Sequence, residues 1–334
     1  MWRNKVFAIA LLLLPLAHVQ AQGVSSSHLY AVLINGGRNR LTNHERYWND
    51  CAFLYRTLRQ TFHIPKSNIT VLMSDGGDPE EDMLRADARG FASSSPDLDG
   101  DGQSDINYAA TNIAVSNVLI KLSRQLTTDD HLFLFVVDHG GTRDHEHDSF
   151  IWLWNDEQLQ DYALATLLNL FHIGSVNVLM GQCYGGGFID DLTGSQRIVT
   201  TACAGSEQSW TSPDKPFDEF VYHWICAVNG GDENGNAVNA DTNGDDQVSM
   251  AEAFEYAKSH DRVHETPQYL SQPEELGTLW TFGKASNGIS ESPLWQADDE
   301  PAEAWSLSGI RRQEPSAHGV YIVRQGGKTR KIIK

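Results

Sequence analysis

The chain has 334 residues and a formal net charge of −19. Such a negative charge argues against nucleic acid and anionic membranes as partners and suits a soluble protein that binds cations. The length allows either one large domain or a domain with an appendage. Four cysteines are too few and too scattered for a disulfide scaffold, although a pair among Cys51, Cys203 and Cys226 stays open.

Residues 1–21 have the features of a secretory signal peptide in the expected order. Arg3 and Lys5 precede an apolar run over 6–17, and Val19-Gln20-Ala21 places small residues where a signal peptidase cuts. That run is too short to cross a bilayer as a permanent helix, and no later stretch is long and apolar enough. We therefore expect export and no transmembrane segment, with a buried amino-terminal helix as the alternative.

The mature chain alternates short apolar runs with helical patterns. Runs closed by glycine and rich in Val and Phe are typical of strands buried on both faces of a parallel sheet, and strand, helix and strand in this order form right-handed crossover units. We expect an open α/β sandwich of at least five strands. Strands are expected at 29–34, 69–73, 131–138, 176–180 and 198–202, a short strand or hairpin arm at 150–154, and helices at 45–62, 113–125, 156–170 and 217–228.

Two of these strands lead into residues that can do chemistry. The run 131–138 is followed by His139 and Gly140, and the run 176–180 by Cys183 and three glycines. Reactive groups of parallel sheets collect beyond the carboxyl ends of the strands. A thiolate formed beside a histidine is a strong nucleophile, and the N–H groups of Gly140 and Cys183 could face an oxyanion. The pattern predicts cysteine-dependent acyl transfer, with Cys183 as nucleophile and His139 as general base.

Other interpretations of these residues remain. Cys183 could be an inert buried cysteine, and His139 a structural histidine. A zinc site is a sharper rival, because imidazoles and carboxylates at close spacing bind zinc. The residues that could form it are His139, Asp144, His145, His147 and Asp148.

Two acidic loops have the spacing of calcium ligands. The first carries Asp97, Asp99, Asp101 and Asp105 around a glycine turn, but Tyr108 stands where a bidentate glutamate would close the site, so a solvated acidic loop is the alternative. In the second, Gln247 would bind through its backbone carbonyl and Glu252 bidentately, while Asp246 replaces the usual glycine. The second set of ligands is Asp241, Asn243, Asp245, Gln247, Ser249 and Glu252. We expect calcium to act as a structural clip.

The carboxy-terminal part of the chain changes composition. Residues 284–303 are rich in Gly, Ser, Pro and acidic residues, as in a linker. Residues 304–334 alternate apolar side chains around Gly326-Gly327 and end in basic residues, which predicts a small β-hairpin. This segment resembles the end of the carboxy-terminal sorting domain of type IX secretion. The resemblance implies that the secretion machinery is a partner and that the protein is released by, or held on the surface of, a Gram-negative bacterium. An ordinary terminal hairpin is the alternative.

The order strand, Asp138-His139-Gly140, helix, strand, Cys183-Tyr184-Gly185-Gly186 resembles the legumain-like cysteine peptidases of the caspase clan. The resemblance covers about 29–210, with a looser match to Phe282. It implies a peptidase domain at 22–283 with a caspase-like three-layer α/β sandwich and a mostly parallel sheet. It also implies cleavage of peptide bonds in protein or peptide substrates through an acyl-enzyme.

The chain departs from legumains next to the nucleophile. Gly181-Gln182 stand where legumains have an acidic residue and alanine, so cleavage after asparagine is not implied. His44 and Arg46 lie near the position of the basic residues that shape the asparagine pocket of legumains. Two alternatives remain: a non-catalytic, calcium-dependent surface binding protein on the same fold, and a zinc hydrolase that uses the cluster from His139 to His147.

Overall fold

The computed structural model describes residues 22–144 and 147–283, together with four short strands between residues 303 and 333. The chain divides into two units, Met1–Ala285 and Ser286–Lys334. The predicted signal peptide at 1–21 and residues 284–302 of the predicted linker lie outside the described residues.

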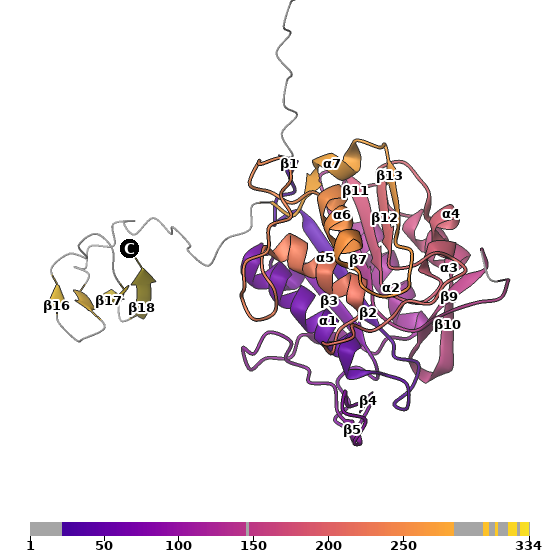
Figure 1. Cartoon of the computed structure of the whole chain (residues 1–334), viewed down its shortest axis with the longest axis horizontal. Helices are drawn as coiled ribbons and strands as arrows, with labels where there is room; N and C mark the ends of the chain where they lie inside the picture. The colour runs from indigo at the N-terminus through magenta and orange to yellow at the C-terminus, as the bar shows by residue number, and fades with distance from the viewer. Residues whose placement is uncertain are drawn as a thin grey trace, which may run out of the picture. The chain divides into compact units, whose positions relative to one another are not determined.

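A seven-stranded sheet forms the centre of the first unit (Figure 1). Six of its strands run parallel, and only the edge strand β13 is antiparallel to its neighbour. In spatial order the strands are β13 (Gln268–Gln272), β12 (Arg197–Thr201), β11 (Ser175–Met180), β7 (His131–Val136), β2 (Leu29–Asn35), β3 (Ile69–Met73) and β6 (Ile106–Tyr108). All five predicted sheet strands are present, and β6 and β13 extend the sheet at its two edges.

Helices cover both faces of this sheet, which explains why its strands are apolar throughout. Ala31 and Leu33 of β2 belong to the core beneath α1, α5 and α6, whereas Val32 and Ile34 belong to the core beneath α2, α3 and α4. The predicted three-layer α/β sandwich is therefore confirmed. The helices are α1 (Glu45–Arg56), continued by the π-helical turn η1 (Thr57–Thr61), α2 (Asn112–Gln125), α3 (Asp161–Leu168), α4 (Ile189–Leu192), α5 (Glu219–Asn229), α6 (Met250–His260) and α7 (Leu276–Leu279).

A small antiparallel sheet follows β7 and corrects one prediction. It consists of β8 (Gly140–Thr142), β9 (Ser149–Leu153) and β10 (Glu157–Gln160). We expected a helix from residue 156, but residues 157–160 pair with β9 instead. Asn155 and Asp156 have φ angles of 62° and 60°, which no α-helix accommodates, so the chain turns back and α3 begins only at Asp161.

Shorter strands complete the structure. In the first unit, β1 (Gln22–Gly23) pairs with β14 (Trp280–Thr281), and β4 (Met83–Leu84) pairs with β5 (Phe91–Ala92). In the second unit, the order is β16 (Arg311–Arg312), β15 (Glu303–Ser306), β17 (Val320–Gln325) and β18 (Lys328–Ile333). The antiparallel pairing of β17 with β18 confirms the predicted terminal hairpin. Within the described residues, no helix has the length and apolar character needed to span a membrane.

Candidate active site

Neighbouring strands bring His139 and Cys183 to the same edge of the sheet. Val136 ends β7 directly beside Met180, which ends β11, and the Gly181 N–H continues the pairing by donating to the Val136 carbonyl at 2.8 Å. His139 and Cys183 each follow three residues later. Gly140 packs so closely on the segment that follows β11 that a Cβ at this position would collide with the Cys183 carbonyl oxygen.

His139 is held in one tautomer. Its Nε2 lies 2.9 Å from the Thr42 carbonyl oxygen, and because a carbonyl can only accept, Nε2 carries the hydrogen. The lone pair of the neutral ring is therefore on Nδ1. Burial lowers the pKa of His139; the Thr42 carbonyl opposes this shift, and Arg46 and Arg38 add to it. The resting imidazole is neutral and can accept a proton.

The buried Asp138 carboxylate organises the backbone around His139. It accepts hydrogen bonds from the Gly36 N–H, from the Gly37 N–H at 2.9 Å and from the His139 N–H at 2.6 Å. Burial raises the pKa of Asp138 well above its ordinary value, and the three N–H groups oppose this shift. One side chain thus fixes both His139 and the start of the loop that supplies the Thr42 carbonyl.

Two aromatic rings enclose His139. The rings of His44 and Tyr47 lie edge-on to it, with centroid distances of 5.3 and 5.4 Å. Burial, together with the nearby Arg46 and His139, lowers the pKa of His44 to about 4, so this ring is also neutral. Burial raises the pKa of Tyr47 well above its ordinary value, so its hydroxyl stays protonated.

Cys183 is partly exposed and its sulfur contacts another loop. Sγ lies 3.7 Å from the Ser209 carbonyl oxygen, and among the hydrogen bonds of the described residues none joins Cys183 to His139. Burial raises the pKa of the Cys183 thiol, the Ser209 backbone and Arg46 oppose the shift, and Asp218 adds to it. The resting site is therefore a thiol beside a neutral imidazole.

The pairing of Arg46 with Asp218 lies beside both groups. Arg46 Nε donates to Asp218 Oδ1 at 2.6 Å, and its second nitrogen donates to the Tyr47 hydroxyl at 2.8 Å. The Asp218 N–H donates in turn to Asp50 at 3.1 Å. Sequence reasoning named Arg46 and missed Asp218, because nothing in the pattern links two residues that lie 172 positions apart.

The proposed zinc cluster does not assemble among the described residues. His139 Nε2 is engaged by Thr42, and His147 Nδ1 lies 3.1 Å from a carboxylate oxygen of Asp190. Within the described part of the chain, Asp97, Asp99 and Asp105 form the one group of three or more His, Cys, Asp or Glu side chains close enough to hold an ion. His145 lies outside the described residues.

The first acidic loop brings three of its four predicted ligands together. Carboxylate oxygens of Asp97, Asp99 and Asp105 lie within 4.8 Å of one another, whereas Asp101 is not part of the group. Asp105 is buried and bonded to the Tyr55 hydroxyl at 2.8 Å. Burial raises the pKa of Asp99, and the neighbouring carboxylates add to the shift, as expected for like charges that share a site.

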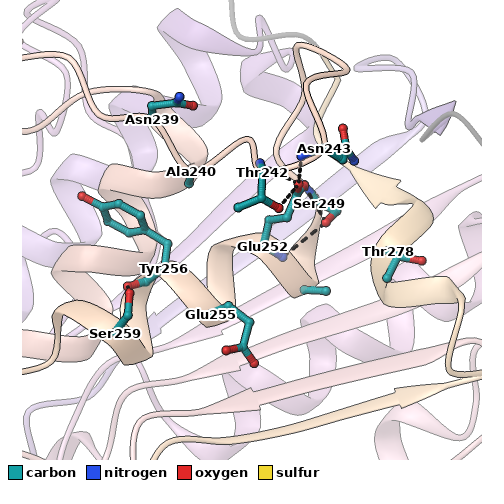
Figure 2. Close-up of a pocket in the computed structure, with 11 residues that line it drawn as sticks. Asn239, Ala240, Thr242, Asn243, Ser249, Glu252, Glu255, Tyr256, Ser259 and Thr278 are labelled. Carbon is teal, nitrogen blue, oxygen red and sulfur yellow. Dashed lines mark hydrogen bonds between the residues drawn. The ribbon is translucent and has the colours of Figure 1, made fainter.

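The second acidic loop has the predicted backbone but uses its glutamate differently. Asp246 adopts a φ of 64°, the left-handed conformation expected where glycine is usual. Figure 2 shows Glu252 at the start of α6, where its oxygens accept hydrogen bonds from Thr242 and Ser249. Together with Ser249 it forms a capping box. The remaining predicted ligands mostly accept backbone N–H groups within the loop: Asp241, Asn243 and Asp245 do so, while the Gln247 side chain accepts from the Thr281 hydroxyl.

Comparison with known proteins identifies the family. None of the curated proteins matches the chain. A crystal structure of a protein from Geobacter sulfurreducens is similar to 73% of this chain and 93% of its own, with 14% sequence identity and a TM-score of 0.41. Residues 29–275, which include β2, β7, β11 and both candidate catalytic residues, match the Peptidase C13 family. The chain therefore belongs to the peptidase C13 family, the legumain family of the caspase clan, whose members are cysteine peptidases.

Proposed function

We propose that the protein is a cysteine endopeptidase that cleaves peptide bonds through Cys183 and His139. The observation that carries this proposal is the hydrogen bond from His139 Nε2 to the Thr42 carbonyl, which leaves Nδ1 as the basic nitrogen at the edge where β11 delivers Cys183. Family membership supports the cysteine chemistry, and the geometry supports the assignment of roles.

The reaction begins when Nδ1 of His139 accepts the Cys183 proton as substrate binds. The thiolate attacks the scissile carbonyl carbon, and the oxyanion that forms is stabilised by the N–H groups of Gly140 and Cys183. The C–N bond then breaks, His139 returns the proton to the leaving amine, and a thioester remains on Cys183. Water activated by His139 hydrolyses this thioester and restores both residues.

A thiol that is protonated at rest fits this scheme. Both partners are neutral in the free enzyme, so the proton passes from Cys183 to His139 as the sulfur attacks the substrate carbonyl. The Arg46 guanidinium favours the thiolate, but the Asp218 carboxyl with which it pairs disfavours the thiolate more strongly, so His139 is the group that must take the proton.

Cys183→Ala tests the nucleophile. We expect it to lower the rate of cleavage of a peptide library by at least about 1,000-fold, and any residual activity should be insensitive to iodoacetamide. Cys226→Ala, which alters a buried cysteine of α5, is the matched control and should retain activity. Activity that survives Cys183→Ala but is lost with phenanthroline would favour the zinc hydrolase. A wild-type protein that cleaves nothing would favour a binding protein on the same fold.

We also propose that calcium binds the two acidic loops as a structural ion. In the first loop, oxygens of Asp97, Asp99 and Asp105 converge, and Lys66 Nζ, which lies 2.6 Å from Asp105, balances only part of their charge; a divalent cation would balance the rest. In the second, Asp241 and Glu252 lie at the two ends of a loop with the left-handed turn at Asp246. To bind the ion there, Glu252 would give up its hydrogen bonds with Thr242 and Ser249.

Thermal unfolding with added calcium tests this second proposal. Calcium at about 100 times its dissociation constant should stabilise the fold by about 2.7 kcal/mol and raise the melting temperature by several degrees. Asp99→Asn and Asp241→Asn should each remove part of the increase. A melting temperature that does not change with calcium would eliminate both sites.

Export is proposed on the signal-like features of residues 1–21 and the sorting-like segment at 304–334. An extracellular setting would supply calcium at the concentrations that weak structural sites need. Cell fractionation should find the protein outside the cytoplasm, beginning at Gln22; an intact amino terminus on cytoplasmic protein would contradict the proposal.

A further inference from the structure

Reciprocal glutamate contacts join the two loops beside the nucleophile. One loop follows β12 and the other follows α6. The Trp210 N–H of the first loop donates to Glu265 of the second at 2.9 Å. In the other direction, the N–H and hydroxyl of Thr266 donate to the two oxygens of Glu207 at 2.8 and 2.9 Å. Each loop therefore depends on a carboxyl group of the other.

The loop after β12 is also the one that contacts the nucleophile. The Ser209 carbonyl lies 3.7 Å from Cys183 Sγ, and the Glu207 carbonyl accepts the Tyr184 N–H at 2.8 Å. Ser209 directly precedes Trp210, so the hydrogen bond between Trp210 and Glu265 determines where the Ser209 carbonyl lies. The position of the thiol thus depends on Glu265.

Glu265 faces a second carboxyl group. Glu265 Oε1 and Asp261 Oδ2 are both buried, and the two side chains are close enough to share a hydrogen bond. Burial raises the pKa of Glu265 to about 9, and the negative charge of Asp261 adds to the shift. Burial also raises the pKa of Asp261. Two buried carboxyls in this arrangement retain a proton at neutral pH.

The other charged and titratable groups around the pair do not neutralise it. Arg262 is engaged elsewhere, since it donates to Glu219 at 2.6 Å and to Asp214 at 2.7 Å. Glu219 adds negative charge near Asp261, and Glu265 in turn raises the pKa of Cys183 and Cys203. A proton is therefore the available means of balancing the charge.

We propose that Asp261 and Glu265 form a proton-dependent positioning element for Cys183, in which the shared proton lets Glu265 hold the Trp210 backbone and thereby the Ser209 carbonyl against the thiol. When the proton is lost, the two carboxylates repel each other, so Glu265 moves away from Asp261 and shifts the Trp210 backbone that donates to it, and the thiol loses its acceptor. This inference rests on the proposed function for its kinetic consequence, but the positioning of the thiol is independent of turnover.

Amide variants remove the titrating proton but keep the shape of the side chain. Glu265→Gln is neutral at every pH, its carbonyl can still accept the Trp210 N–H, and its NH₂ can donate to Asp261. Asp261→Asn removes the second negative charge and serves as an independent variant should Glu265→Gln fail to fold. The matched control is Glu274→Gln, an exposed glutamate in the turn after β13.

We expect wild-type kcat/KM to decline on the alkaline side with an apparent pKa near 9. Glu265→Gln and Asp261→Asn should lack this decline while their activity at pH 7 stays within about threefold of wild type, and Glu274→Gln should retain it. Alkylation of Cys183 by iodoacetamide, followed by mass spectrometry of its peptide, gives a second readout. Above pH 9 the wild-type residue should react about 3-fold to 10-fold more slowly than Cys183 of Glu265→Gln, because ionised Glu265 raises the pKa of the thiol, and at pH 7 the two rates should be equal.

Two results overturn the inference: an alkaline decline that is absent in wild type, or one that both amide variants retain. Equal alkylation rates at every pH would also overturn it. Failure of the proposed function has a different signature, because a protein without peptidase activity that still shows the alkylation difference would retain the positioning element.

Discussion

The catalytic edge is the edge of the sheet where His139 follows β7 and Cys183 follows β11, and its two halves are held by different contacts. On the β7 side, His139 depends on the Asp138 carboxyl, which meets three backbone N–H groups, and on the Thr42 carbonyl. On the β11 side, Cys183 depends on a carbonyl whose position is set by a glutamate that faces another carboxyl. Backbone N–H groups and a backbone carbonyl hold the first half, whereas the contact that holds the second half is the one for which we propose a shared proton. We therefore expect hydrogen bonds to fix the position of the histidine, and pH to change the position of the cysteine.

Among substitutions that leave both catalytic side chains in place, the largest effect is expected where the two halves touch. Gly140→Ala places a Cβ on the Cys183 carbonyl and on the Gln182 side chain, so the strand ends must separate. We expect kcat/KM to fall by about 100-fold or more, because a misplacement of about 1 Å has effects of that size. Gly77→Ala is the control, since a Cβ there meets no atom within 4 Å. Full activity in Gly140→Ala, measured by peptide hydrolysis, would show that the close approach is dispensable.

A smaller effect is expected when the Asp138 carboxyl group is replaced by an amide. Asp138→Asn offers one acceptor oxygen where three N–H groups converge, and its NH₂ faces one of those donors. An unsatisfied buried donor costs about 1–3 kcal/mol, which denaturant unfolding should detect. We also expect kcat to decrease more than KM increases, because the His139 ring is displaced while the substrate contacts remain. Unchanged stability and kcat would remove Asp138 from the positioning of His139.

The smallest effect is a change in how stability depends on pH. The pKa of Glu265 rises from an ordinary value of 4.5 to about 9 in the folded protein, so the folded state holds more protons between these values. The stabilisation is complete below about pH 4.5 and is lost as pH rises through about 9. Wild-type melting temperature should therefore decline across this window, and the decline should be shallower in Glu265→Gln. Parallel curves for the two proteins would contradict the raised pKa.

Local pattern was sufficient to predict the core of the fold and one part of the site. Apolar runs ending in glycine indicated the sheet strands, and the strand ends brought His139 and Cys183 to one edge. The match to the Peptidase C13 family over residues 29–275 confirms the resemblance on which the fold and the peptidase assignment rested. Both inferences depend only on short stretches of adjacent residues.

The contacts that join distant segments could not be predicted in this way. Arg46 meets Asp218, and Trp210 meets Glu265, through the packing of loops whose sequences show no periodic signal. The strand β10 was mistaken for helix because its partner β9, and not its own composition, determines its conformation. The second acidic loop illustrates the same limit: its ligand spacing was recognised, but the use of Glu252 as a helix cap was not.

The pairing of β1 with β14 brings residues 22–23 beside residues 280–281, near both limits of the described part of the first unit. Gly23 lies opposite Thr281, and the Val24 N–H continues the pairing to the Thr281 carbonyl at 3.0 Å. A short peptide could therefore join residue 283 to residue 22, with new termini opened in an exposed loop such as the one around Gly77. A circularly permuted enzyme made this way would keep every contact of the catalytic edge.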